Sequence, residues 1–204
     1  MTKDALLAVH GKRILLDTNI IMKIEDSTKD VRETLLQFAS TNDVCICDTV
    51  LYELLRNLNA KRFRERHNLI RKAGLNCISE GTQAVQAMFE RISWLYLSLL
   101  NKEPTNFLHR QQNDLWIIAA GLANGVRHFL TTDKSSDFLP AVFQTQIFAL
   151  DGKQKLCLHT FNNAAATKAW AKLSAEEACT IKLSRNYLEE IRKQSLSLQN
   201  SYKV

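Results

Sequence analysis

Five acidic side chains lie at points where the pattern of apolar residues changes. They are Asp17, Glu53, Asp114, Asp133 and Asp137. Asp17 and Asp133 each follow a short apolar run of the kind that forms a buried strand. In a sheet of parallel strands with flanking helices, the carboxyl ends of the strands meet at one edge, and ligands bind there. We expect the helices that carry Glu53 and Asp114 to begin at the same edge, so that four carboxylates converge.

Such a cluster of carboxylates predicts a site for divalent metal. Carboxylates in one small space repel each other, and their pKa values rise unless a cation neutralises them. Oxygen ligands suit the hard ions Mg²⁺ and Mn²⁺. Two such ions about 4 Å apart activate a water molecule and stabilise the leaving oxygen when a phosphodiester is cleaved. We therefore expect Asp17, Glu53, Asp114 and Asp133 to bind or orient metal and water, with Asp137 as a metal ligand that assists or replaces Asp133.

Polar residues beside the acids are candidates for supporting contacts. Thr18, Asn19 and Thr132 are expected to orient the acids or to contact phosphate. Each acid alone also fits an ordinary role, since Asp17 could start a turn and Asp114 could favour a helix N-terminus by its charge. The other acids could be solvated helix or turn residues. Their joint placement at successive strand ends and helix starts favours the metal site.

The segments that must position the acids alternate between strand and helix. Strands are predicted from Arg13 to a functional turn at Asp17–Asn19, over Val44–Cys47 and over Val126–Leu130, and helices over Val31–Ser40, Val50–Leu58, Lys61–Lys72 and Thr82–Leu100. Asn113 is predicted to cap a helix that begins at Asp114 and ends at Asn124–Gly125. The dipeptide Asp151–Gly152 favours a tight turn, which predicts a hairpin at the edge of the sheet.

This alternation predicts an α/β domain over residues 1–161, with a mostly parallel central sheet flanked by helices. Residues 162–204 are rich in alanine, lysine and glutamate, and Ser174 and Glu177 have the spacing of a capping box. We expect this segment to form a helical C-terminal extension that packs on the domain or on a partner.

The chain of 204 residues has a formal net charge of +6 and a pI near 9.1, which favours polyanionic partners. Arg62, Arg64 and Arg66 lie in a strongly basic segment and are candidates for RNA phosphate contacts, although a solvated helix face fits this segment equally well. No apolar run approaches the roughly 18 residues of a membrane span, and the N-terminus lacks the pattern of a signal peptide. We expect a cytoplasmic protein without a membrane partner.

Four motifs, in order, resemble those of the PIN-domain family, particularly its VapC-like toxin ribonucleases from bacterial and archaeal toxin–antitoxin pairs. They are ILLDTNIIMKI at Ile14–Ile24, VLYELLRNL at Val50–Leu58, NDLWIIAAGLANG at Asn113–Gly125 and FLTTDKSSDF at Phe129–Phe138. The resemblance implies a Rossmann-like sheet, cleavage of single-stranded RNA with Mg²⁺ or Mn²⁺, homodimers, and an antitoxin that inserts a segment across the site. The chain is longer than a compact toxin of this family, and its tail after Asn162 has no counterpart there.

The leading hypothesis is a metal-dependent endoribonuclease that hydrolyses RNA phosphodiester bonds as the toxin of a toxin–antitoxin pair. A PIN-like module that binds RNA or protein without cleaving is the alternative from a different class. A nuclease that acts on DNA is a third hypothesis.

Overall fold

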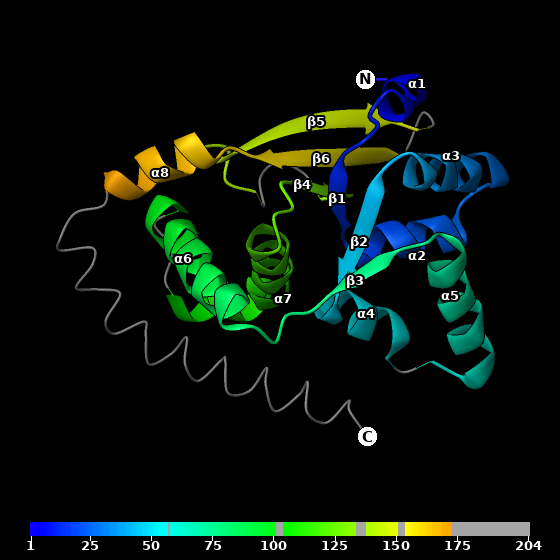
Figure 1. Ribbon diagram of the computed structural model, residues 1–204, viewed down its shortest axis with the longest axis horizontal. Coiled ribbons are helices and arrows are strands. Elements are labelled where there is room, and N and C mark those ends of the chain that lie inside the picture. Colours follow the sequence, from blue (N-terminus) through cyan, green and yellow to red (C-terminus); the bar gives the residue numbers. More distant parts are fainter. Residues whose placement is uncertain (57, 101–103, 134–137, 151–153, 173–204) are drawn as a thin grey trace.

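The computed structural model describes residues 1–56, 58–100, 104–133, 138–150 and 154–172 (Figure 1). Asp137, the Asp151–Gly152 turn and the capping box at Ser174 and Glu177 lie outside these residues. Of the expected C-terminal extension, the described part contains one helix, α8, over Asn163–Ala171. The division of the chain at residue 161 stays a prediction.

Six strands form one sheet in the order β3-β2-β1-β4-β6-β5. Their bounds are Arg13–Leu16 for β1, Asp43–Cys47 for β2, Asn76–Ile78 for β3, His128–Thr131 for β4, Phe143–Ala149 for β5 and Lys155–Phe161 for β6. Strands β1 to β4 pair in parallel, whereas β6 is antiparallel to β4 and to β5. The expected α/β architecture with a mostly parallel sheet is confirmed.

Helices cover both faces of the parallel strands. Figure 1 shows α6 and α7 on one side of β1 and β2, and α2, α3 and α5 on the other. The remaining bounds are Lys3–Leu7 for α1, Thr18–Asp26 for α2, Lys29–Ser40 for α3, Asp48–Leu55 for α4, Ala60–Lys72 for α5, Gln83–Leu100 for α6 and Pro104–Ala123 for α7. Because both faces are covered, β1, β2 and β4 are buried along almost their whole length, as parallel strands usually are.

Helix α7 packs closely against the two central strands. A Cβ atom at Gly121 would lie 2.8 Å from a ring carbon of Phe129 on β4 and 3.0 Å from a methyl carbon of Leu15 on β1. Only glycine permits this approach without a shift of its neighbours. Asp114, which is exposed, lies seven residues earlier, two helical turns away on the same face of α7.

The start of α7 corrects one prediction. The helix begins at Pro104, so Asn113 is not a cap and Asp114 lies in the helix interior. Proline suits the first position of a helix, and no glycine or further proline follows before Gly121. The functional turn predicted at Asp17–Asn19 is also shorter than expected. Only Asp17 lies between β1 and α2, because α2 begins at Thr18.

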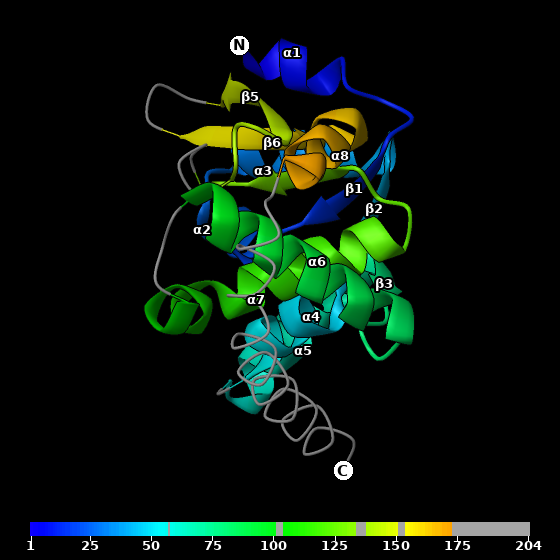
Figure 2. The ribbon, with the colours of Figure 1, turned by 90° about the vertical axis from the view of Figure 1, so that its left-hand side faces the viewer.

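The hairpin of β5 and β6 is confirmed at the edge of the sheet, with Ala149 opposite Lys155 and the Leu150 N–H donating to the Gln154 carbonyl at 2.9 Å. Helix α6 lies beside α7 (Figures 1 and 2) and buries Trp94, which contacts Trp170 of α8. None of the helices in the described residues combines the length and the apolar character that a membrane span requires.

Candidate active site

Asp17 lies at the carboxyl end of β1, next to the end of β4. The two strands are parallel neighbours with Leu16 opposite Leu130, and the Asp17 N–H donates to the Leu130 carbonyl at 3.0 Å. The Oδ2 atom of Asp17 accepts hydrogen bonds from Thr131 Oγ1 at 2.6 Å and from Asn19 Nδ2 at 2.8 Å. The paired ends of two parallel strands therefore hold the first acid in a fixed orientation.

Asn19, on the first turn of α2, connects Asp17 to the segment that follows β4. Its Oδ1 accepts from the Thr132 N–H at 3.0 Å, and its Nδ2 donates to Asp133 Oδ2 at 3.4 Å as well as to Asp17. The Asp133 N–H donates to Thr131 Oγ1 at 3.1 Å. Asn19 thus contacts both acids through its side chain, whereas Thr132 contributes its backbone N–H to this network.

Glu53 reaches the same region from α4. Its Oε2 accepts from Thr18 Oγ1 and its Oε1 accepts from Asn113 Nδ2, each at 2.5 Å. Thr18 and Asn113 are the chain neighbours of Asp17 and Asp114. Glu53 is therefore fixed between α2, which begins directly after Asp17, and α7, which carries Asp114.

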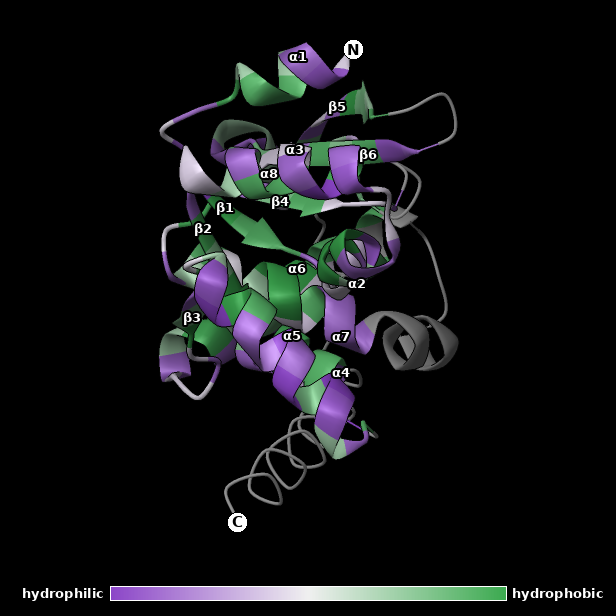
Figure 3. Cartoon of the chain, turned by 90° about the vertical axis from the view of Figure 1, so that its right-hand side faces the viewer, coloured by the Kyte–Doolittle hydropathy of each residue, from purple (hydrophilic) through white to green (hydrophobic). Residues whose placement is uncertain are grey.

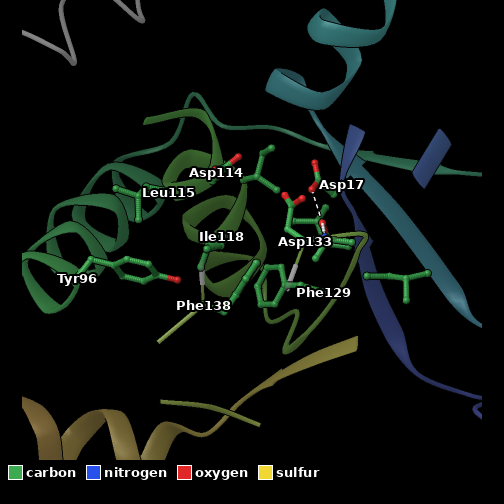
Figure 4. Close-up of a pocket in the computed structure, with 12 residues that line it drawn as sticks. Asp17, Tyr96, Asp114, Leu115, Ile118, Phe129, Asp133 and Phe138 are labelled. Atoms are coloured by element: carbon green, nitrogen blue, oxygen red, sulfur yellow. Dashed lines mark hydrogen bonds between the residues drawn. The ribbon is translucent and has the colours of Figure 1, made fainter. Parts of the chain in front are cut away.

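Asp114 lines a small cavity together with Asp17 and Asp133, and apolar side chains such as Leu115 and Phe138 form its other walls (Figure 4). Its free volume is about 20 Å³, enough for roughly one water molecule. The structure thus brings together four of the five acids that the sequence singled out, because Glu53 lies close enough to Asp17 to affect its pKa and the other three line the cavity.

The environment of Asp17 is unfavourable for its negative charge. Burial is the largest cause that raises the pKa of Asp17, and the charges of Asp133 and Glu53 raise it further. The hydrogen bonds from Thr131 and from the Thr18 backbone oppose this rise but do not cancel it. A cation bound among these carboxylates would relieve the repulsion.

Comparison with known proteins assigns the chain to a family. The model of one family, the PIN domain, matches residues 14–139, which is more than half of the chain and includes all four acids. The chain belongs to the PIN domain family.

One chain of a solved structure, the crystal structure of VapBC2 from Rickettsia felis bound to a DNA fragment from their promoter, is similar to this PIN domain protein. The sequences are 18% identical, the similarity covers 59% of this chain and 88% of that chain, and the TM-score is 0.42. No curated protein matches the chain.

The donor set of the PIN domain suits a divalent cation. Asp17, Glu53, Asp114 and Asp133 offer only oxygen ligands, which Mg²⁺ and Mn²⁺ prefer. Within the described residues, no group of three or more His, Cys, Asp or Glu side chains has the arrangement that holds a metal ion. Glu53 is directed to Thr18 and Asn113 instead, so it would have to exchange one of these hydrogen bonds to bind a cation.

The three arginines expected to contact RNA differ in their surroundings. Arg62 and Arg64 are exposed on α5. Arg66 is only 8% exposed, and its guanidinium contacts Glu25 Oε2 at 2.8 Å and donates to the Leu54 carbonyl at 2.7 Å. Arg66 therefore connects helices within the fold, which corrects the expectation that it is available to RNA.

Sequence reasoning missed three residues that shape the site. Thr131 and Asn113 bind the acids through their side chains. His159 is fully buried on β6, stacks on Phe138 at 3.8 Å between ring centroids, and lies with Nε2 3.3 Å from the Asp133 carbonyl. Nothing in the local sequence of β6 places His159 beside Asp133, because the contact depends on how β4 and β6 pair.

Proposed function

We propose that this PIN domain protein is a metal-dependent endoribonuclease that hydrolyses RNA phosphodiester bonds. The observation that supports it most is that carboxylates from separate elements lie close together: Asp17, Asp114 and Asp133 line one small cavity, and Glu53 binds the chain neighbours of Asp17 and Asp114. Structural ion pairs would satisfy these charges with arginine or lysine, but the side chains that donate to Asp17 and Glu53 among the described residues are neutral hydroxyl and amide groups. PIN domains are in general divalent-metal nucleases, which agrees with this chemistry.

In the proposed reaction, Asp17, Glu53, Asp114 and Asp133 would hold Mg²⁺ or Mn²⁺, and the ion would supply water activation and neutralisation of charge on the phosphate. Asn19 and Thr131 orient the Asp17 carboxylate, and Asn19 also fixes the segment that carries Asp133. Thr18 and Asn113 limit the positions that Glu53 can take.

The decisive experiment is cleavage of labelled single-stranded RNA with Mn²⁺, Mg²⁺ or chelator. We expect cleavage that requires metal and falls by at least about 100-fold in Asp114→Asn, because the amide keeps the shape but lacks the charge that binds metal. Asp26→Asn is the matched control, since Asp26 is exposed at the far end of α2. Cleavage by Asp114→Asn at the wild-type rate would contradict the proposal.

The same assay with single-stranded DNA and duplex DNA tests the substrate class. We expect RNA to be cleaved preferentially. Faster cleavage of DNA would replace the endoribonuclease with a deoxyribonuclease, and stable protein that binds RNA without cutting it in any metal would favour the binding module.

The toxin role rests on the resemblance of the four motifs to VapC-like proteins, and it includes an antitoxin partner and a homodimer. Induced expression in bacteria tests it, with growth arrest expected for the wild type and not for Asp114→Asn. A small gene adjacent to that of this protein should relieve the arrest when it is expressed together with it. Growth unaffected by active nuclease would exclude the toxin role and leave the nuclease intact.

A further inference from the structure

Helix α5 carries an exposed aromatic row that the acidic site does not use. Phe63, His67 and Arg71 are spaced four residues apart, which places them along one face of the helix. The Phe63 side chain is 43% exposed, and its ring is parallel to that of His67 within 8°, with 6.2 Å between centroids. An exposed aromatic ring offers a flat apolar surface on which another ring can stack.

Positive charge surrounds this row. Helix α5 carries one exposed anion, Glu65, and five exposed cations, Lys61, Arg62, Arg64, Arg71 and Lys72. None of the five takes part in a salt bridge among the described residues, while Arg66 is compensated by Glu25. Figure 3 shows α5 as a largely hydrophilic helix on the face turned to the viewer. The combination of exposed rings and free cations is complementary to the bases and phosphates of a single strand.

Helix α5 is also held in a fixed position relative to the acids. Arg66 lies one turn from Phe63 on the inner side, and it donates to the carbonyl of Leu54, the residue after Glu53. The same guanidinium contacts Glu25 on α2, the helix that begins next to Asp17. A strand of nucleic acid on the outer face of α5 would therefore be held in a constant position relative to the site.

We propose that Phe63 and His67, flanked by Arg64 and Arg71, form a platform that stacks bases and binds phosphates of single-stranded RNA that extends from the acidic site. This inference rests on the proposed function in one respect, namely that the substrate is RNA. The row is too basic for an apolar protein partner to be its occupant. A duplex, whose bases are stacked internally, cannot use the exposed rings in this way.

Binding can be measured without cleavage, by the fluorescence anisotropy of a labelled single-stranded RNA with chelator present and Asp114→Asn as the background. We expect Phe63→Leu to weaken binding about five-fold or more, because one base–aromatic stack is lost. Phe63→Tyr keeps the ring and should bind like the parent. The pair separates stacking from apolar contact, since leucine retains the apolar surface.

The proposed phosphate contacts are tested by the dependence of RNA affinity on salt concentration. Replacing Arg64 and Arg71 by glutamine should reduce the slope of log affinity against log salt by about 0.7 for each contact. Lys168→Gln, an exposed cation on α8, is the matched control and should leave the slope unchanged. Melting temperatures equal to the parent's would show that the exposed substitutions leave the fold intact.

Wild-type affinity in Phe63→Leu, or equal affinity for duplex and single strand, would overturn the platform. Loss of self-association in Phe63→Leu by light scattering, without loss of RNA affinity, would overturn it in favour of a contact between copies. Binding that depends on Phe63 in a protein that never cleaves RNA would retain the platform and reject the nuclease. Cleavage of RNA by a protein whose RNA binding does not depend on Phe63 would retain the nuclease and reject the platform.

Discussion

Asp17 illustrates, at the scale of a single residue, how a site can reduce the stability of the fold that carries it. Its raised pKa means that the charged form is disfavoured in the folded state, chiefly by burial and then by Asp133 and Glu53. Asp17→Asn removes that charge and can still accept from Thr131. We expect it to abolish cleavage and to raise the free energy of unfolding in chelator by about 1 kcal/mol, or 2–4 °C in melting temperature.

Calorimetry in chelator measures this change, with Asp26→Asn as the control for removing an exposed acid. A lower melting temperature for Asp17→Asn would show that its hydrogen bonds matter more than the repulsion.

The residues of the site were predictable to different degrees. Asp17 and Asp133 could be found from the sequence because apolar runs end in front of them, and Asp114 was found although its helix begins earlier than predicted. Thr131 and Asn113 could not be found, because their hydrogen bonds to Asp17 and Glu53 join residues that are far apart in the sequence. Arg66 was misassigned, because a basic segment does not reveal which of its cations turns inward.

At the scale of elements, Arg66 shows how a helix outside the sheet is attached to the site. Its guanidinium bridges α5 to the Leu54 carbonyl of α4 and to Glu25 of α2. Arg66→Gln leaves Glu25 without its cation in a place where water has limited access. Since Glu25 is partly exposed, we expect a loss of about 2 kcal/mol in the free energy of unfolding, below the 3–5 kcal/mol typical of fully buried pairs.

Urea unfolding provides the measurement, and Arg64→Gln on the exposed side of the same helix is the matched control, with a change within about 0.5 kcal/mol. Equal effects of the two substitutions would mean that the Arg66 bridge does not stabilise the packing of α5.

Element types were more predictable than element ends. Strands β1, β2 and β4 were identified by continuous apolar runs, because both of their faces are covered. Helix α6 was identified by its long apolar segment. The start of α7 was missed because Asn113 resembles a cap, whereas the segment from Pro104 continues the helix without a break. The short strand β3 lacks a period long enough to be recognised.

At the scale of the whole molecule, the order of acids and apolar runs was sufficient to predict a parallel α/β sheet, and the antiparallel β5–β6 hairpin extends that sheet at one edge. Every acid of the site comes from a different element, so metal would connect β1, α4, α7 and the end of β4. A ligand that binds only the folded state stabilises the entire fold through these elements.

We therefore expect Mn²⁺ to raise the melting temperature of the wild type. At 100 times the dissociation constant the gain is about 2.7 kcal/mol. For a chain of this size, each kcal/mol corresponds to about 2–4 °C. Asp17→Asn should begin from a higher melting temperature in chelator and gain little from Mn²⁺, so the melting temperature of the wild type should reach and then exceed that of Asp17→Asn as metal is added. Asp26→Asn should follow the wild type. A wild-type melting temperature that stays constant across the titration, while Mn²⁺-dependent cleavage is observed, would mean that metal enters with the RNA and not with the folded protein alone.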